Sequence, residues 1–337
     1  MTPEKEHILV IRLGALGDLV FCFQSFHEIR QAHPNAKIAL LTRAPFAAFA
    51  KSLPWFDHII IDTHPTFAAP LGWARLRREV LDFSPDRIYD LQGKRRQTIL
   101  YALLGGPFGP AWSGAAPFCK FPRPKLSKSS DSRFAEKLSR FSAKRSRTGP
   151  PTQGMSFADF MAAQLRAAGV PALPAPDLAF LDANVEKFAL PARYVVLIPG
   201  SSPDAPHKRW SARKFAELAR KLGMPCIVVG TNADAEAVGS IKVFAPEIVD
   251  LCGKTSLFEL AGILRRAALV VGNDTGPLHM AAVLRAPTIA LFSGKSSPVW
   301  SKPPGSKVVV KQSQNLADLG VDEVVAAIKG LGGCVFS

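Results

Sequence analysis

The chain has 337 residues, of which 47% are hydrophobic and 20% charged, and its formal net charge is +15. This length suits two domains of about 150 residues, and the apolar content excludes a chain too polar to build a core. No apolar run approaches the ~20 residues that a membrane-spanning helix needs. The N-terminus is unlike a signal peptide because Glu4 and Glu6 precede its apolar run, so we expect a cytoplasmic protein.

Along the chain, apolar segments of strand length alternate with amphipathic segments of helix length, which is typical of a parallel sheet covered on both faces. The first half has four such strands, at 7–13, 37–42, 58–62 and 86–91. The second half has five, at 193–199, 225–230, 247–251, 268–272 and 287–292. The sequence therefore predicts an α/β protein with two Rossmann-like parallel sheets.

A proline-rich segment without helical periodicity, residues 169–192, separates the two halves. We place the boundary near Leu181, which gives an N-terminal domain of residues 1–180 and a C-terminal domain of residues 181–337. Proteins of this class bind ligands beyond the carboxyl ends of their strands. We therefore expect the functional residues in those loops, on both sides of a cleft between the domains.

The cysteines predict neither disulfides nor a metal site, because no two form a CxxC pair and no histidine lies at ligand spacing. The five are Cys22, Cys119, Cys226, Cys252 and Cys334. We expect them to be reduced and mostly packed in the core.

Positive charge is concentrated between Lys120 and Arg147, where ten Lys or Arg stand against Asp131 and Glu136. A solvated basic loop, an anionic membrane surface and a nucleic acid are the alternatives that this patch leaves open. The chain carries no helix-turn-helix, zinc-finger or RNA-binding signature, so we expect no nucleic-acid partner. An anionic membrane with phosphorylated lipid fits the patch better.

The first motif, Leu13-Gly14-Ala15-Leu16-Gly17-Asp18, directly follows the first strand and precedes a helix expected to run to about His33. Its glycines allow a tight turn and the close approach of a ligand. It lacks the third glycine of a dinucleotide fingerprint, and the second strand ends without the acid that binds a ribose. Asp18 stands in the first helical turn, where a carboxylate is either a simple cap or a functional group.

The second motif, Pro199-Gly200-Ser201-Ser202, opens the second domain after its first strand, and His207-Lys208-Arg209-Trp210 follows closely. Small hydroxyl residues with free backbone amides, and a lysine within reach, form a suitable place for a diphosphate. A plain surface turn is the alternative.

The third motif is the segment 271–282, VGNDTGPLHMAA, in which a strand ends at a turn and an apolar helix begins. Asp274 or Thr275 can cap this helix, and the amides of Thr275 and Gly276 are then available to an anion. His279 lies four residues after Thr275 and so on the same helix face.

Two segments resemble the end of a nucleotide-binding P-loop, namely Gly253-Lys254-Thr255 and Gly294-Lys295-Ser296. Each lacks the glycine that the motif requires five positions earlier, where Ile248 and Ile289 stand instead. We therefore expect no ATPase chemistry.

Taken together in chain order, these motifs resemble glycosyltransferase family 9, the ADP-heptose:lipopolysaccharide heptosyltransferases. The shared pieces are Gly-x-x-Gly-Asp after the first strand, Asp90-Leu91-Gln92-Gly93, Pro-Gly-Ser-Ser followed by Lys208-Arg209-Trp210, and Asn-Asp-Thr-Gly-x-x-His followed by Ala-Ala.

The resemblance implies an inverting, metal-independent GT-B enzyme that uses no cofactor, binds a lipid-linked glycan acceptor on its N-terminal domain and holds ADP-heptose mainly on its C-terminal one. It implies two catalytic residues, Asp18 as the base and Lys208 on the leaving diphosphate. The implied donor-binding residues are Ser201, Ser202, Asp274, Thr275, Gly276 and His279, and the implied acceptor-binding residues are Gly14, Gly17 and Gln92.

The chain departs from the family pattern at two places. Residues 154–159 replace a His-led segment, and Ser293-Gly294-Lys295 replaces a Gly-Pro pair after the sixth strand. Two alternatives therefore stay open: a transferase of the same fold with another nucleotide sugar and glycan acceptor, and a non-catalytic module that binds sugar nucleotides or polyanions.

Overall fold

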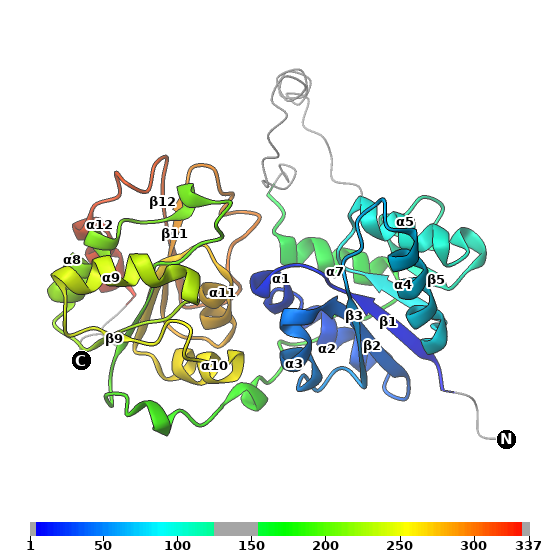
Figure 1. The fold of residues 1–337 in the computed structure, drawn as a ribbon, viewed down its shortest axis with the longest axis horizontal. Coiled ribbons are helices and arrows are strands. Elements are labelled where there is room, and N and C mark those ends of the chain that lie inside the picture. Colours follow the sequence, from blue (N-terminus) through cyan, green and yellow to red (C-terminus); the bar gives the residue numbers. More distant parts are fainter. Residues whose placement is uncertain (1–4, 125–153, 332–337) are drawn as a thin grey trace, which may run out of the picture. The chain divides into compact units, whose positions relative to one another are not determined.

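The computed structural model describes residues 5–124 and 154–331, and these form two compact units. Within the described residues, the first unit comprises 5–124 and Ala158–Asp177, and the second comprises 154–157 and 178–331. Each unit is built on a six-stranded parallel sheet with helices on both faces (Figure 1). The predicted α/β class with two parallel sheets is confirmed.

The sheet of the first unit has the strand order β3-β2-β1-β4-β5-β6. Its strands are β1 (His7–Ile11), β2 (Lys37–Arg43), β3 (His58–Asp62), β4 (Arg87–Asp90), β5 (Ala111–Gly114) and β6 (Phe121–Pro122). The central strands are apolar throughout because both of their faces are covered: Ile8, Leu9, Val10 and Ile11 are all fully buried.

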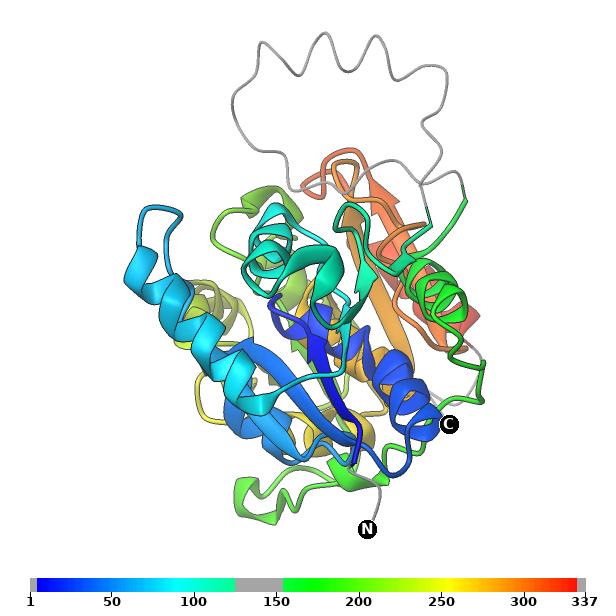
Figure 2. The same cartoon turned by 90° about the vertical axis from the view of Figure 1, so that its right-hand side faces the viewer.

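Helices cover the two faces of this sheet in separate groups (Figure 2). The helices of the unit are α1 (Leu16–Val20), α2 (Phe23–Ala32), α3 (Ala44–Lys51), α4 (Pro70–Phe83), α5 (Arg95–Leu103), the short 3-10 helix η1 (Gly106–Phe108) and α7 (Phe157–Ala167). Helices α4 and α5 pack on one face through residues such as Leu76 and Leu100. Helices α2, α3 and α7 lie on the other face.

The second unit repeats the first in its strand order, β9-β8-β7-β10-β11-β12. Its strands are β7 (Val195–Ile198), β8 (Cys226–Val228), β9 (Val249–Asp250), β10 (Leu269–Asn273), β11 (Thr288–Ser293) and β12 (Val308–Ser313). In each sheet the first three strands in sequence are added toward one edge and the last three toward the other. The switch points therefore lie between β1 and β4 and between β7 and β10. Such switch points are where doubly wound sheets bind ligands.

Helices of the second unit are likewise divided between the faces. They are α8 (Ala212–Leu222), α9 (Ala235–Phe244), α10 (Leu257–Arg266), α11 (Gly276–Val283) and α12 (Val321–Gly330), with 3-10 turns η2 (Ala179–Leu181), η3 (Glu186–Phe188), η4 (Pro206–Lys208) and η5 (Asn232–Asp234). Helices α8, α9 and α12 share one core cluster. Helices α10 and α11 cover the opposite face.

Three strands were missed by the sequence patterns, and one helix was predicted too long. Strands β5 and β6 are short and lack a continuous apolar run, and β12 is only half-buried, with an apolar run that ends after three valines. The helix expected to run unbroken to His33 is divided between α1 and α2. The Cys22 amide bonds to the Leu19 carbonyl three residues back, which tightens the chain between the two helices.

Four cysteines lie in the described residues, and all are free and buried. Burial raises the pKa of Cys22 to about 11 and those of Cys226 and Cys252 to about 12, so these thiols stay protonated. Cys334 and most of the basic stretch from Lys120 to Arg147 lie outside the described residues. Within the part of the chain that the structure covers, no helix has both the length and the apolar content to span a bilayer.

Candidate active site

At the switch point of the first unit, a buried arginine holds an exposed carboxylate. Arg12 directly follows β1, and its guanidinium donates to the Asp18 carboxylate Oδ1 at 2.7 Å and to the Asp18 backbone carbonyl at 3.0 Å. A third hydrogen bond reaches the carbonyl of Leu91, beyond β4. Arg12 therefore connects the two central strands and fixes the direction in which Asp18 points.

The same carboxylate also caps α1. Asp18 Oδ2 accepts the Ala15 amide at 2.9 Å, which satisfies an otherwise orphan donor at the helix start. A Cβ atom on Gly14 would lie 2.1 Å from this oxygen, so only glycine leaves room for the carboxylate. Gly17 is buried inside α1. Asp18 therefore caps the helix, and its side chain is still 46% exposed, so the cap leaves the carboxylate accessible.

Gln92 lies in the loop after β4 and binds the loop after β1. Its Oε1 accepts the Leu13 amide at 3.2 Å. Asp90, at the end of β4, accepts the amides of Gln92 and Gly93 at 3.0 and 2.8 Å and so shapes the turn. Burial raises the pKa of Asp90 despite these bonds. The Gln92 amide nitrogen donates to no described residue.

A partly buried arginine, Arg123, also holds this turn. Arg123 donates to the Asp90 carbonyl at 3.0 Å and to Gln164 on α7 at 2.9 Å, and burial lowers its pKa. Gln164 in turn donates to the same Asp90 carbonyl at 3.0 Å. A Cβ on Gly93, whose φ is +60°, would lie 1.9 Å from the Arg123 guanidinium. Only glycine therefore allows this contact.

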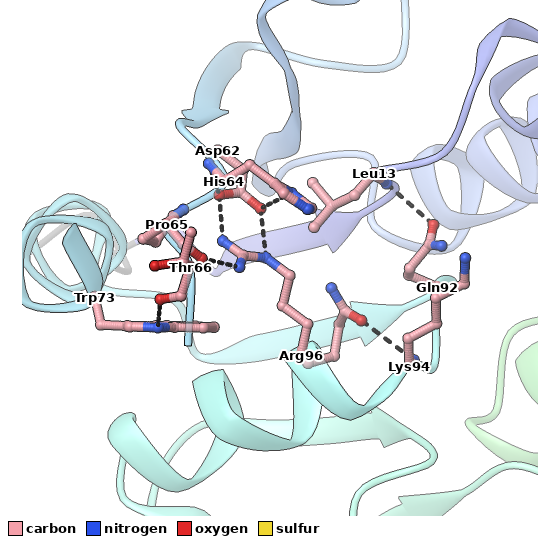
Figure 3. A network of polar contacts seen from close by, with 10 residues as sticks. Leu13, Asp62, His64, Pro65, Thr66, Trp73, Gln92, Lys94 and Arg96 are labelled. Carbon is pink, nitrogen blue, oxygen red and sulfur yellow. Dashed lines mark hydrogen bonds and ion pairs between the residues drawn. The ribbon is translucent and has the colours of Figure 1, made fainter. Parts of the chain in front are cut away.

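Beside the loop after β4, an ion pair at the end of β3 fixes the start of α5 (Figure 3). Arg96 donates to both oxygens of the buried Asp62, at 2.7 and 3.0 Å, and to the Pro65 carbonyl at 2.7 Å. Its guanidinium also lies 4.4 Å from the ring centre of Trp73. Because Asp62 is fully buried and Arg96 nearly so, this pair makes the carboxyl edge of the sheet rigid.

In the second unit, the hydroxyl of Ser201 stabilises the loop after β7. Ser201 Oγ donates to the Ala205 carbonyl at 3.1 Å and accepts from Arg209 at 3.0 Å. Arg209 also reaches the Ser201 carbonyl at 3.3 Å. Ser202 is exposed, and its carbonyl accepts the Ala205 amide. The predicted phosphate turn is therefore a preformed loop.

A lysine, an aspartate and a histidine meet at the switch point of the second unit. Lys208, in η4, forms an ion pair with Asp274 Oδ2, and His279 Nε2 lies 3.1 Å from Asp274 Oδ1. Burial by itself raises the pKa of Asp274, but the contacts with His279 and Lys208 outweigh it and lower this pKa to about 2. The aspartate is therefore ionised and buried, while Lys208 remains partly exposed.

The turn between β10 and α11 differs from the prediction in how it is capped. Thr275 occupies the N-cap position, but its hydroxyl donates to the Asn273 carbonyl at 3.2 Å. The Asp274 carboxylate is taken up by Lys208 and His279, so neither predicted side chain caps α11. The amides of Thr275 and Gly276 consequently bond to no described residue, and an anion is suited to fill that role.

Asn273 fixes this turn against the loop after β7. It is fully buried, accepts the Trp210 amide at 3.0 Å and donates to the Pro199 carbonyl at 2.7 Å. The turn that carries Asp274 and the loop that carries Ser201 are thus one rigid assembly. Among the described residues, no group of three or more His, Cys, Asp or Glu side chains is placed to hold a metal ion.

Within each unit, the structure brings the predicted residues together. Gly14, Gly17, Asp18 and Gln92 lie in the first unit, and Ser201, Ser202, Lys208, Asp274, Thr275, Gly276 and His279 lie in the second. The sequence patterns missed Arg12, Arg123, Asp62 and Arg96. Arg12 could have been found from the sequence, because a charged residue directly after the apolar run ILVI indicates a functional position at the end of a buried strand.

A model of glycosyltransferase family 9 (heptosyltransferase) matches residues 73–322. The chain is 34% identical over 113 residues to lipooligosaccharide heptosyltransferase 2 of Haemophilus influenzae and 33% identical over 113 residues to lipopolysaccharide heptosyltransferase 2 of Escherichia coli K12. Each match covers 31% of this chain and 32% of the relative, so the aligned part spans about a third of these relatives.

Solved structures of similar fold cover nearly the whole chain. A glycosyltransferase family 9 protein from Veillonella parvula superposes with a TM-score of 0.76 at 20% identity, covering 98% of both chains. The E. coli ADP-heptose lipopolysaccharide heptosyltransferase II gives a TM-score of 0.70 at 19% identity, covering 96% of this chain and 98% of that one. The fold is thus that of the heptosyltransferase structures, and the family match over residues 73–322 shows that the chain belongs to glycosyltransferase family 9.

Proposed function

We propose that the chain is an inverting, metal-independent glycosyltransferase that moves heptose from ADP-heptose to a lipid A-linked core acceptor of lipopolysaccharide. One observation carries this proposal: the switch point of the first sheet presents a carboxylate, Asp18, and the equivalent point of the second presents a cation, Lys208. Glycosyl transfer from a diphosphate needs both a proton acceptor and a stabiliser of the leaving group. The names of the relatives support the choice of donor and acceptor.

In this mechanism, Asp18 accepts the proton of the acceptor hydroxyl as its oxygen attacks the anomeric carbon of the donor. Arg12 and the Ala15 amide each donate one hydrogen bond to a different oxygen of the carboxylate. Each oxygen therefore retains a second lone pair that can accept the proton. The two hydrogen bonds hold the carboxylate in one orientation, which lowers the entropic cost of reaching the transition state. Attack opposite the leaving group inverts the anomeric centre.

The bond between the anomeric carbon and the phosphate oxygen breaks in the same step, and its electron pair leaves with ADP. Lys208 and the amides of Thr275 and Gly276 meet the charge that grows on the diphosphate. Because Asp274 holds Lys208 in place, this cation needs little reorganisation during the reaction. Ser201 and Ser202 form the preformed loop beside it, and His279 fixes Asp274.

We assign the acceptor to the N-terminal domain, which carries Gly14, Gly17 and Gln92 together with Asp18, and the donor to the C-terminal domain. Peripheral contact with an anionic membrane would place the enzyme beside a lipid-linked acceptor, and the basic stretch of residues 120–147 supplies the charge for it. Co-sedimentation with anionic vesicles should fall as salt is added, whereas equal sedimentation with neutral vesicles would remove this role.

The decisive test is calorimetry of ADP binding followed by a transfer assay, both with a metal chelator present. We expect ADP to bind and heptose to be transferred from ADP-heptose to a heptose-deficient core lipid. Loss of binding or of transfer on adding chelator would contradict the metal-free mechanism. Binding of ADP without transfer to any acceptor would instead favour a non-catalytic module.

A further inference from the structure

The turn that follows β11 is a fixed structure that presents a lysine. The Ser296 amide donates to the Ser293 carbonyl at 2.9 Å, which closes a tight turn around Gly294 and Lys295. Gln312, on the neighbouring strand β12, donates to the Ser293 carbonyl at 3.2 Å and to the Ser296 carbonyl at 3.1 Å. The backbone under Lys295 is therefore anchored, while its side chain is exposed.

This turn lies at the same sheet edge as the pair of Lys208 and Asp274. Strand β11 is the direct neighbour of β10, and the Asp274 amide donates to the Leu291 carbonyl at 3.2 Å. The 3-10 turn η4, which carries Lys208, packs against β11. All three segments thus surround the carboxyl ends of two adjacent strands.

The charges at this edge show that a second cation is available there. Lys208 is neutralised by Asp274, so the pair has no net charge, whereas Lys295 forms no ion pair with any described residue. The pKa of His207 responds to the charges of Lys295, Lys208 and Asp274. Burial lowers its pKa, the positive charges of Lys295 and Lys208 lower it further, and Asp274 acts in the opposite sense. The geometry agrees, because η4 packs against β11 and Lys295 follows the end of that strand by two residues.

The turn also contains two hydroxyls that lack hydrogen bonds in the described part of the chain. Ser293 and Ser296 are both buried, and their Oγ atoms have no partner there. Buried hydroxyls without partners are unfavourable, so the hydrogen-bonding capacity of this turn is not fully used by the described residues.

We propose that Lys295 is a second diphosphate-binding cation of the donor site and acts together with Lys208. This inference rests on the proposed function. A nucleoside diphosphate carries at least two negative charges, and a lysine already compensated by Asp274 balances them only in part. Lys295, in the Ser-Gly-Lys segment that replaces the Gly-Pro pair of the family pattern, supplies the missing positive charge.

Calorimetry on the full chain tests this with Lys295→Met and the matched control Lys242→Met. Lys242 is also exposed, but it lies in the last turn of α9, at the amino edge of the sheet. With chelator present, Lys295→Met should weaken the binding of ADP and of inorganic pyrophosphate about tenfold, as the loss of one charge-assisted contact predicts. Adenosine, which has no phosphate, should bind all three proteins equally.

The outcomes separate this inference from the proposed function. ADP binding by Lys295→Met within twofold of wild type would overturn the role of Lys295 and leave the function intact. Wild-type protein that binds neither ADP nor pyrophosphate would overturn both. An equal loss of affinity in Lys242→Met would mean that only overall charge is being measured, which also overturns the inference.

A second measurement requires no ligand. The pKa of His207 can be followed by NMR titration of its ring protons, with the resonance assigned through His207→Gln. Removing a nearby cation favours the protonated ring, so Lys295→Met should raise the pKa of His207 toward its ordinary value, and Lys242→Met should leave it unchanged. An unchanged pKa in Lys295→Met would show that Lys295 lies away from η4 and would overturn the inference.

Discussion

The two units place an ion pair at the same point of the same strand order, but they bury opposite members of it. In the first unit, the buried partner is the cation, since the Arg12 side chain is 3% exposed and the Asp18 side chain 46%. In the second, the buried partner is the anion, since the Asp274 side chain is 3% exposed and the Lys208 side chain 28%. In the first site the more exposed member is therefore the anion, and in the second it is the cation.

In each ion pair, the buried residue fixes the position of the exposed residue. A buried ion is held by the surrounding core, and it fixes the exposed ion in one place while the latter remains within reach of a ligand. Under the proposed function, Arg12 orients Asp18 as the proton acceptor of the first unit, and Asp274 orients Lys208 as the anion-binding cation of the second. The two units then differ in which member of the ion pair is buried.

The strongest test of this comparison is Asp18→Asn, which removes the negative charge from the first site and preserves its shape. If Asp18 is the base, turnover should fall by about 10² to 10⁴, while ADP affinity remains that of wild type. Asparagine has one acceptor oxygen in place of two, so one of the bonds to Arg12 and Ala15 is lost and stability should decrease by about 1 kcal/mol. Transfer assays, calorimetry and thermal melting measure the three quantities.

Asp86→Asn is the matched control for this substitution. Asp86 is also exposed and accepts a backbone amide, that of His7 at 2.8 Å, but it stands at the amino edge of the same sheet. Its loss should affect melting alone. Turnover of Asp18→Asn within a few-fold of wild type on a competent acceptor would show that the base lies elsewhere.

A smaller loss of rate is expected when the exposed cation of the second site is removed. Lys208→Ala should lower turnover about 10²-fold, because losing one group that stabilises the leaving charge typically costs ~3 kcal/mol. ADP affinity should fall as well, in contrast to Asp18→Asn. The control is Lys221→Ala, which removes another ion-paired lysine, at the far end of α8. An unchanged rate in a folded Lys208→Ala variant would reduce Lys208 to a structural role.

The smallest effect concerns the buried aspartate and its dependence on pH. The pKa of Asp274 is about 2 in the folded chain against an ordinary 3.8, so its ionisation contributes about 2 kcal/mol of stability. That contribution is complete above the unfolded pKa and is lost as the pH falls through the folded one. The difference in unfolding free energy between wild type and Asp274→Asn should therefore shrink between pH 4.5 and pH 2.5.

Denaturant titrations at several pH values measure this difference. Asp322→Asn is the matched control, because Asp322 is 86% exposed and its ion pair with Lys221 is screened by solvent. Its unfolding free energy relative to wild type should change little over the same range. A constant difference for Asp274→Asn would mean that the buried carboxylate is not held in its ionised form by Lys208 and His279.

The sequence by itself determined the class of the fold, its two sheets and the segments that form the sites. Buried parallel strands need apolar side chains on both faces, so runs such as ILVI and VVLI are visible without any structure. Glycine turns directly after strands are equally visible, because few other residues permit a close approach of backbone, carboxylate or ligand. This is why the sequence indicates Gly14, Asp18, Lys208 and Asp274 as candidate site residues.

Only the tertiary structure decided which of these residues are partners and which of them face solvent. Arg12 and Leu91 are far apart in the sequence and meet because β1 and β4 are neighbours, and Lys208 and Asp274 meet because β7 and β10 are. Nothing local distinguishes Asp274, which is buried and paired, from Asp18, which is half-exposed. Burial and pairing are properties of the packed sheet, and the charge that each site presents is set there.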